Sequence, residues 1–237
     1  MKATTEFDEI TVFGARGHSL MILRGLEEAW LGRVRIRALI DDIENGFLHP
    51  ELGIPVISSA ERLQRYLDLP ILLTPGSPAL RARMAAQFAD EGAIFATACH
   101  PGQIHVDPAA VYGAGSLCSP LTRIGPGVGI GAGAQVLGTV VGHDVLIGAF
   151  TTVGFGCMIS GHVTIGEGVT LAPNAVIANG TRARPLRIGD GAVIGVGAAV
   201  LRDVAPGARM VGNPAMPMRD WIRLRRLISG QSGQGSR

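Results

Sequence analysis

The segment Ile124-Gly-Pro-Gly-Val-Gly-Ile130-Gly-Ala-Gly-Ala-Gln-Val136 has an aliphatic residue at every sixth position. A small residue usually follows each aliphatic one, and Val, Ala or Thr usually stands four positions after it. Apart from a one-residue slip after Val136 and an insertion after Ile177, the spacing continues at Val106, Tyr112, Cys118, Val141, Ile147, Val153, Ile159, Ile165, Leu171, Ile188, Ile194 and Val200. Chance would not keep this frame over so long a segment, so it is a structural repeat.

A hexapeptide period is typical of a parallel β-helix, in which each unit supplies one short strand and a turn. Three units form a triangular coil of about 18 residues, with the aliphatic side chains stacked inside. Turns need small residues or positive φ, which explains the glycines. A glycine-rich linker would not carry an aliphatic residue at every sixth position.

The composition agrees with a narrow aliphatic interior, because hydrophobic residues make up 47% of the chain and aromatic residues only 5%. Of the 34 glycines, 23 lie between residues 102 and 212, so the two halves differ in kind. The formal charge of +2 does not favour nucleic acid as a partner. Ile124–Gly142 and Val145–Gly166 contain no Asp, Glu, Lys or Arg, although the second contains His162. The glycine content of the first and the period of both argue against membrane spans.

The first hundred residues predict a small α/β domain with a parallel sheet. Helices are expected over Leu20–Leu31, whose apolar residues lie near one face, and over Ala79–Asp90. Strands are expected at Glu9–Phe13, Val34–Ile40, Leu69–Thr74 and Ala93–Ala98. A strand, a turn and a helix therefore alternate along this half.

Three strand ends in this half carry candidate ligand contacts, since ligands bind at the carboxyl ends of parallel strands. They are Gly14–His18, Asp41-Asp42 and Pro75–Ser77. Glycines let backbone N–H groups approach a phosphate, and a helix N-terminus favours negative charge. The pattern is not a full GxGxxG, and a tight turn alone would explain Gly14 and Gly17 equally well.

His143 is the strongest candidate for chemistry in the repeat. It stands two positions after the aliphatic Val141, so its side chain is expected to point outward, and Asp144 would orient the imidazole and raise its basicity. Gly161 lies one coil later and is expected to stack against His143 at the strand spacing of about 4.8 Å. Its N–H could meet an oxyanion while the imidazole takes a proton. An ordinary exposed histidine would fit the same pattern.

The other histidines give weaker signals. His18 is a candidate ligand contact in the glycine turn, whereas His162 is interpreted as a surface residue. His100 is interpreted as structural, and His49 and His105 as loop residues; the spacing predicts no metal site. The cysteines Cys99, Cys118 and Cys157 have no base partner and are interpreted as packing residues. Their odd number favours a reducing compartment, here the cytoplasm.

Two basic segments remain open in interpretation. The insertion Asn179–Arg187 contains Arg182, Arg184 and Arg187, which suit phosphate groups, although a solvated loop explains them equally well. Arg219–Leu227 predicts a short basic amphipathic helix, more often a cap on a repeat stack than a membrane or RNA contact. Gln231–Arg237 is expected to be disordered.

Together, several motifs resemble the sialic acid O-acetyltransferase and bacillosamine-pathway amino-sugar acetyltransferase family, over about residues 8–216. That family consists of hexapeptide-repeat acyltransferases with a left-handed β-helix. The motifs are Gly14-Ala-Arg-Gly17-His18, Ala38-Leu-Ile-Asp41-Asp42, His100-Pro101, Val141-Gly-His143-Asp144-Val-Leu-Ile147-Gly148 and Val211-Gly-Asn-Pro-Ala215.

The resemblance implies an enzyme that transfers an acetyl group from acetyl-CoA to the amine or hydroxyl of a sugar, often nucleotide-linked. It implies a homotrimer with active sites between neighbouring coil stacks. His143 is implied as the general base, Asp144 as its acidic neighbour, and the Gly161 amide at the thioester carbonyl. Acetyl-CoA contacts are implied at Thr152, Gly161, Pro173 and Val196. Sugar-nucleotide contacts are implied at Arg16, Gly17, His18, Asp41, Asp42, Pro75 and Gly76.

The chain departs from the family pattern at three positions. Gly142 stands where an acid often precedes the histidine, Thr152 where some members have a second histidine, and Gly131 where asparagine is common. These positions bear on the acceptor, so the sequence leaves open whether an amine or a sugar hydroxyl is acetylated. A non-catalytic ligand-binding scaffold is a third hypothesis.

The expected organisation therefore has three parts. Residues 1–101 form a Rossmann-like sugar-nucleotide-binding domain, residues 102–214 a left-handed β-helix acetyltransferase domain, and residues 215–237 a C-terminal helix with a disordered tail. The expected partners are acetyl-CoA, a sugar or sugar nucleotide, and further copies of the chain. No metal, nucleic acid or membrane span is expected.

Overall fold

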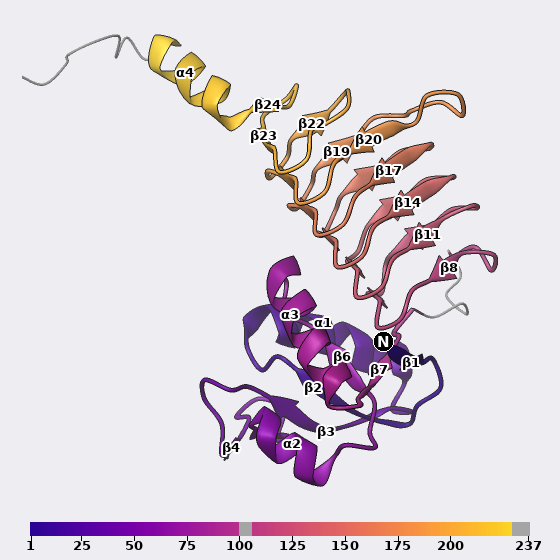
Figure 1. Cartoon of the computed structure of the whole chain (residues 1–237), viewed down its shortest axis with the longest axis vertical. Helices are drawn as coiled ribbons and strands as arrows, with labels where there is room; N and C mark the ends of the chain where they lie inside the picture. The colour runs from indigo at the N-terminus through magenta and orange to yellow at the C-terminus, as the bar shows by residue number, and fades with distance from the viewer. Residues whose placement is uncertain (100–105, 229–237) are drawn as a thin grey trace, which may run out of the picture.

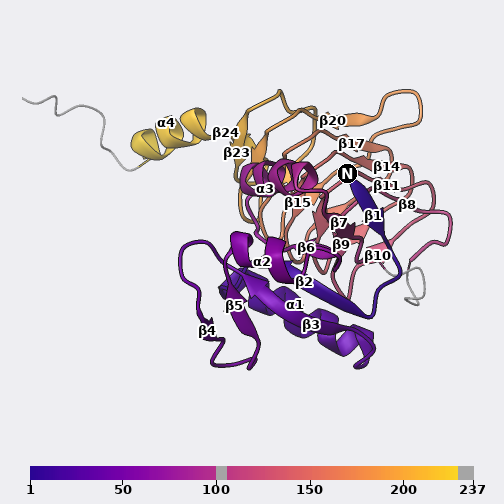
Figure 2. The same ribbon diagram turned by 60° about the horizontal axis from the view of Figure 1, so that its bottom comes forward.

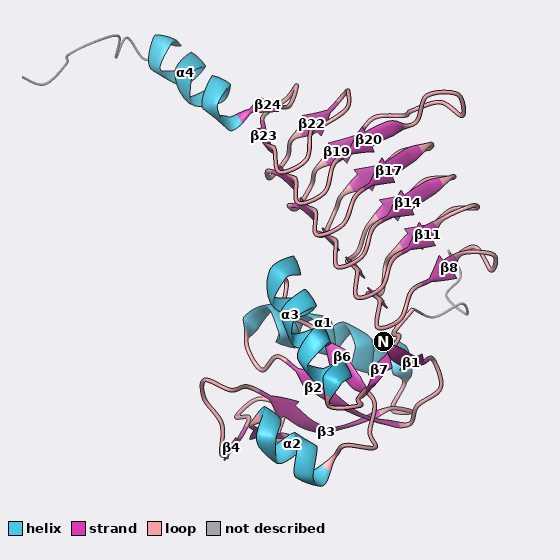
Figure 3. Ribbon diagram, in the orientation of Figure 1, coloured by secondary structure: helices cyan, strands magenta, loops and turns pink. Residues whose placement is uncertain are grey.

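The computed structural model describes residues 1–99 and 106–228. Figure 1 shows an N-terminal part built of helices and strands, a long stack of coils beside it, and helix α4 projecting from the far end of the stack. Helices are confined to the N-terminal part and to α4, while the stack contains strands and turns (Figure 3). The two compositional halves of the sequence are thus two different architectures.

The N-terminal part is organised around a sheet whose seven described strands have the order β1-β7-β6-β2-β3-β5-β4. All neighbouring pairs are parallel except β4 with β5. The strands are β1 (Lys2–Thr4), β2 (Glu9–Phe13), β3 (Arg35–Ile40), β4 (Phe47–Leu48), β5 (Pro55–Ile57), β6 (Ile71–Leu73) and β7 (Ile94–Ala96). This confirms the four predicted strands and adds β1, β4 and β5.

Three helices accompany this sheet: α1 (Gly17–Trp30), α2 (Ser59–Arg65) and α3 (Pro78–Asp90). Helix α1 begins three residues earlier than predicted and buries Ile22, Leu23, Leu26 and Trp30 along one side. Helices α2 and α3 have conventional N-caps, since the Ser58 and Ser77 hydroxyls accept from the amides three residues on. Helix α2 is too short to show an apolar period, and the sequence reading missed it.

The stack has three walls in its described residues, each a sheet of short parallel strands. Wall 1 contains β10 (Arg123–Ile124), β13 (Val140–Val141), β16 (Met158–Ile159), β19 (Val176–Ile177) and β22 (Ala199–Val200). Wall 2 contains β8 (Val111–Tyr112), β11 (Gly129–Ile130), β14 (Val145–Ile147), β17 (Val163–Ile165) and β20 (Leu186–Ile188). Wall 3 contains β9 (Leu117–Cys118), β12 (Gln135–Val136), β15 (Thr152–Val153), β18 (Thr170–Leu171), β21 (Val193–Ile194), β23 (Arg209–Val211) and the antiparallel β24 (Met216–Pro217).

The register confirms the predicted repeat. Val141 pairs with Ile159, which is 18 residues further along. The one-residue slip shortens an earlier coil, so that Ile124 pairs with Val141. The insertion lengthens a later coil, so that Ile165 pairs with Ile188. The predicted inward aliphatic residues form one buried core along the stack.

Buried polar contacts join the two parts. On one side they involve α3, the end of β6 and the loop between them, and on the other side wall 3 and the turns next to it. Arg81 of α3 is fully buried and donates to the carbonyl oxygens of Gly133, Pro75, Phe150 and Thr151 at 2.6–3.2 Å. Gln135 and Thr152, both in wall 3, donate to the carbonyls of Leu73 and Gly76 at 3.0 and 2.8 Å. Figure 2 shows α3 beside the stack. The sheet edge is therefore attached directly to the coils.

Helix α4 (Met218–Ile228) confirms the predicted C-terminal helix, and none of its residues is buried. Among the described helices, none has both the length and the apolarity needed to cross a bilayer. The three cysteines are free and buried, as predicted for packing residues. The expectations for His100-Pro101, His105, the boundary near residue 101 and the tail Gln231–Arg237 lie outside the described residues.

Candidate active site

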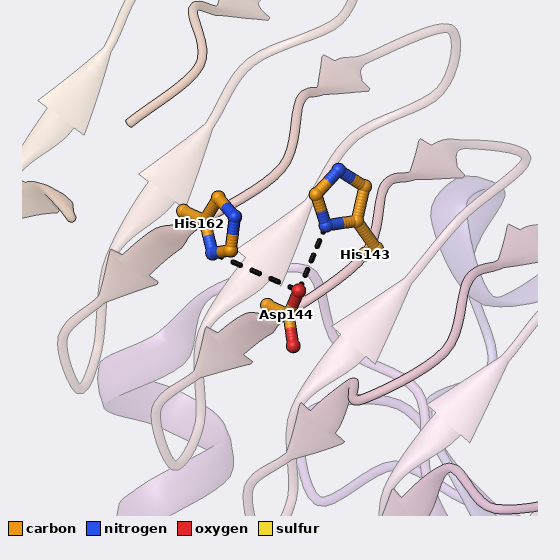
Figure 4. Close-up of side chains that lie close together, drawn as sticks. All are labelled: His143, Asp144 and His162. Carbon is orange, nitrogen blue, oxygen red and sulfur yellow. Dashed lines mark hydrogen bonds and ion pairs between the residues drawn. The ribbon is translucent and has the colours of Figure 1, made fainter. Parts of the chain in front are cut away.

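His143 lies in the turn between β13 and β14, at the corner where walls 1 and 2 meet. As predicted, its side chain points outward and is 53% exposed. Its Nδ1 is 2.8 Å from Oδ2 of Asp144, and both side chains project to the same side in Figure 4. With Nδ1–H donating to the carboxylate, Nε2 is left as the atom that can accept a proton.

Asp144 has a φ of +56°, a left-handed backbone conformation that turns its side chain toward the two neighbouring imidazoles. The hydrogen bond from His143 is the largest influence on the Asp144 carboxyl and lowers its pKa. Nearby positive charge from the histidines and Arg182 acts in the same direction. The carboxylate is therefore ionised at neutral pH and can stabilise a protonated His143.

Gly161 lies one coil beyond His143, as predicted from the register. A Cβ atom at Gly161 would be 2.5 Å from Nε2 of His143, so any larger residue there would displace the imidazole from this position. The Gly161 N–H, however, donates to Oδ1 of Asn179 at 2.7 Å. The oxyanion role predicted for this amide would require Asn179 to release it. Asn179 follows Gly161 by one further coil, which is the signal that could have identified it.

His162 joins the cluster, although the sequence reading took it for a surface residue. Its Nδ1 is 3.7 Å from the same Oδ2 of Asp144, and its side chain is only 26% exposed. The two imidazoles meet edge to face, with centroids 4.9 Å apart and planes at 88°. His162 follows Asp144 by 18 residues, so the period itself brings them together and could have revealed the contact.

Nitrogen and oxygen atoms of these three side chains lie within 4.8 Å of one another. Atoms this close could also bind a metal ion. The 2.8 Å contact between Nδ1 and Oδ2 is the length of a charge-assisted hydrogen bond, with a proton between the atoms. The contact between His143 and Asp144 is therefore a hydrogen bond.

A cavity of about 640 Å³ adjoins the cluster on the outer side of wall 2. Asp144 and His162 form one side, and Arg182 and Pro185 of the inserted loop form another. The insertion thus brings a guanidinium to the candidate site, whereas Arg184 lines a separate cavity of about 490 Å³. Arg187 lies in β20.

The three predicted strand ends of the N-terminal part do converge, on a cavity of about 440 Å³. Of the seven residues predicted to contact a sugar nucleotide, only Gly17 is not in its lining. The lining includes Arg16, His18, Asp41, Asp42, Pro75 and Gly76. The N-terminus of α1 opens beside it, with no acidic residue in its first turn.

The carboxylates of this cavity already have protein donors. Arg16 Nε donates to Asp41 at 2.8 Å, and the amides of Ile43 and Glu44 donate to the other oxygen. Burial raises the pKa of Asp41, but these hydrogen bonds outweigh it and lower the pKa overall. Asp42 accepts from the amide and hydroxyl of Ser59 at 2.7 Å, which fixes the start of α2.

His18 is neutral at pH 7, because burial lowers its pKa. Its imidazole packs against Gly76: a Cβ atom added at Gly76 would be 3.1 Å from Nε2. This ring therefore supports the loop on one side of the cavity.

Of the residues implied as acetyl-CoA contacts, Gly161 lies against His143, whereas Thr152, Pro173 and Val196 lie elsewhere in the same chain. Thr152 is buried, and its hydroxyl donates to Gly76 at the contact between the two parts. Pro173 and Val196 are exposed at the corner between walls 3 and 1. His143 lies at the corner between walls 1 and 2, which is opposite wall 3. These three residues thus occupy other sides of the prism.

Comparison with known proteins identifies the class of this fold. Residues 147–179 match the family model "Bacterial transferase hexapeptide (six repeats)". A segment of 52 residues is 46% identical to UDP-3-O-acylglucosamine N-acyltransferase of Methylobacterium sp. (strain 4-46) and covers 20% of this chain. The match spans only 15% of that relative's length. The coil stack has the fold of hexapeptide-repeat transferases.

Solved structures match most of the chain. WeeI from Acinetobacter baumannii AYE matches with a TM-score of 0.75 and 26% identity, covering 88% of this chain and 99% of that one. The acetyltransferase domain of PglB from Neisseria gonorrhoeae FA1090 matches with a TM-score of 0.77 and 27% identity, covering 89% and 99%. That domain has also been solved with acetyl coenzyme A. These comparisons confirm the predicted resemblance to hexapeptide-repeat sugar acetyltransferases.

Proposed function

We propose that the protein is an acetyl-CoA-dependent acetyltransferase that acetylates the amine of a nucleotide-linked amino sugar. The observation that carries the proposal is the His143–Asp144 hydrogen bond at an exposed corner, with Nε2 lying against Gly161. An imidazole fixed through Nδ1 by a carboxylate is a general base. The similarity to an acetyltransferase domain solved with acetyl coenzyme A supports the donor.

The proposed reaction is a direct transfer within a ternary complex. The acceptor nitrogen attacks the thioester carbonyl while Nε2 of His143 removes a proton from it. As the tetrahedral intermediate collapses, the C–S bond breaks, and the same proton passes from His143 to the leaving thiolate. The ionised Asp144 stabilises the transient imidazolium. A general base of this kind supplies roughly 10²–10⁴-fold in rate.

The proposed acceptor site is the 440 Å³ cavity of the N-terminal part, which we interpret as a Rossmann-like sugar-nucleotide-binding domain. The N-terminus of α1 and Arg16 suit the phosphates of a nucleotide. Gly76 of this cavity is bonded to wall 3, whereas His143 lies at the opposite corner. This placement favours an acceptor that is shared between the cavity of one chain and His143 of another.

We infer that active sites form between copies of the chain in a closed homotrimer. In such a ring, the His143 corner of one copy faces the cavity and the Pro173–Val196 corner of a neighbour. Pro173 and Val196, exposed on the stack, then remain candidate acetyl-CoA contacts. Thr152 is better assigned to joining the two parts of its own chain.

The test is release of free coenzyme A thiol from acetyl-CoA with a panel of amino sugars, their UDP forms and sialic acids. The proposal predicts the highest kcat/KM for a nucleotide-linked amino sugar, with an N-acetylated product by mass spectrometry. If the product is instead an acetyl ester of a sialic acid, the proposed N-acetylation is wrong and the enzyme is an O-acetyltransferase. Absence of acetyl-CoA binding by calorimetry would point to the scaffold hypothesis and reject the enzyme.

A further inference from the structure

The Asp144 carboxylate has two imidazole neighbours, and the proposed reaction uses only one of them. Oδ2 is 2.8 Å from Nδ1 of His143 and 3.7 Å from Nδ1 of His162. The shorter contact is a hydrogen bond, whereas the longer one is a close approach between a potential cation and an anion. Figure 4 shows both rings turned toward this one oxygen.

His162 is held in this position by its backbone and its neighbours. It has a φ of +55°, matching the +56° of Asp144 one coil earlier, and its N–H donates to the carbonyl of His143 at 3.0 Å. Its ring meets the His143 ring edge to face. Since only 26% of the side chain is exposed, His162 is a fixed part of the corner.

We propose that His162 is a positioning residue, which acts through Asp144 to control the orientation and the protonation of His143. This inference rests on the proposed function, because it assigns a role beside the base of that reaction. When His162 is neutral, its ring edge holds the His143 imidazole over Gly161 and leaves Oδ2 to the His143 Nδ1–H. When His162 is protonated, it competes for Oδ2 and repels a proton on His143.

The groups that face His162 carry charges of both signs. Asp144 is the anion, and His143 and the Arg182 guanidinium are the groups of potential or permanent positive charge near that carboxylate. A positive charge on either imidazole is attracted by the Asp144 carboxylate. A second positive charge on the other imidazole would be repelled by the first, because the two ring centroids are only 4.9 Å apart.

Two substitutions separate the parts of this role. His162→Asn keeps a side-chain N–H donor near the position of Nδ1 but cannot be protonated. His162→Phe keeps the ring edge against His143 but removes both the donor and the titration. Arg182→Gln is the matched control, since it removes a neighbouring permanent charge and leaves the imidazole pair intact.

The kinetic test is the dependence of kcat/KM on pH. In the native enzyme, a plot of log kcat/KM against pH should fall on the acid side with a slope between about one and two, because the proposal has protons on both histidines inactivate the site. In His162→Asn the slope should become about one, and in Arg182→Gln it should keep the native steepness. The alkaline plateau of kcat should be kept in His162→Phe, which retains the ring edge against His143, and should fall in His162→Asn, which lacks it.

Imidazole NMR gives a readout that does not need activity. The His143 resonances should titrate in two steps in the native protein and in one step in His162→Asn. Identical one-step curves in both, together with equal acid limbs, would overturn the inference. If the native protein transfers no acetyl group, the proposed function fails, while the NMR titration still decides whether the two histidines are linked.

Discussion

Gly161 shapes the site by having no side chain. The imidazole of His143 lies over its Cα, where a Cβ would be 2.5 Å from Nε2 and 2.6 Å from Cε1. Real contacts are never this short, so any larger residue must push the ring away. Glycine is required here for a close approach, not for turn geometry.

Gly161→Ala should therefore lower kcat by about 10- to 100-fold, since small displacements of a catalytic group have effects of this size. Gly129→Ala is the control on the same stack, because its Cβ would meet only the end of the Leu146 side chain. Steady-state thiol release compares the two. A Gly161→Ala enzyme as active as Gly129→Ala would show that His143 need not lie where the structure has it.

Asp144 has a lowered pKa, caused first by the hydrogen bond from His143. A carboxyl with a depressed pKa keeps its stabilising charge above its ordinary pKa near 3.8 and loses it only as the pH falls through the lower folded value. Asp144 therefore stays ionised between pH 5 and 7, and a loss of activity in that range cannot come from its protonation.

Asp144→Asn should lower kcat by about tenfold or more, as part of the roughly 10²–10⁴-fold that a general base supplies. A pH profile measures the effect, and the loss should persist on the alkaline plateau, where the imidazoles are neutral. Recovery of the native rate at high pH would mean that the carboxylate only adjusts protonation and does not stabilise the imidazolium during the reaction.

Sequence patterns could predict His143 and Asp144, because the hexapeptide frame fixes which positions point outward. The same frame implies that Asp144 meets His162 and that Gly161 meets Asn179, each one coil apart. The direction of those side chains depends on local φ values, such as the +55° of His162, which no spacing reveals. The period places Asn179 beside Gly161, but the spacing does not say that its side-chain oxygen accepts from the Gly161 amide.

At the scale of elements, α3 connects the cavity of the N-terminal part to the coils. Its Arg81 spans four carbonyl groups, from Pro75 beside the cavity to Gly133, Phe150 and Thr151 on the stack. Burial lowers the pKa of Arg81 to about 10, so it remains a cation at neutral pH. The sequence predicts the helix over Ala79–Asp90, but this contact joins distant segments and carries no local signal.

Arg81→Met should lower the free energy of unfolding by about 2–4 kcal/mol, because it leaves several buried carbonyls without donors. Urea denaturation measures this, with Arg83→Met, at an exposed position on the same helix, as the control. Equal unfolding midpoints for the two variants would contradict a role for Arg81 in joining the parts.

The whole molecule is a triangular stack with an α/β part fixed to wall 3. The repeat predicted the stack, and strand-helix alternation predicted the sheet. Their mutual placement depends on Arg81, Gln135 and Thr152, whose partners lie far away in sequence. That placement puts His143 and the cavity on opposite sides of one chain, so the proposed site needs a neighbouring copy.

Complementation between two inactive variants tests this arrangement. His143→Ala lacks the base, and Arg16→Glu would repel phosphates at the cavity. Each variant alone should be nearly inactive. In an equal mixture, half of the chains have an intact base and the other half an intact cavity. If each site takes its base from one chain and its cavity from another, about a quarter of the sites combine two intact parts, so about a quarter of native activity should return. A mixture that stays inactive after subunit exchange would mean that base and cavity act within one chain.

The central claim is that the imidazole of His143 removes the proton during acetyl transfer. The most direct measurement is kcat for His143→Ala with acetyl-CoA and a nucleotide-linked amino sugar, alongside the Kd for acetyl-CoA by calorimetry. A fall in kcat of at least about a hundredfold with little change in Kd is the predicted result. Turnover close to that of the native enzyme would contradict the claim.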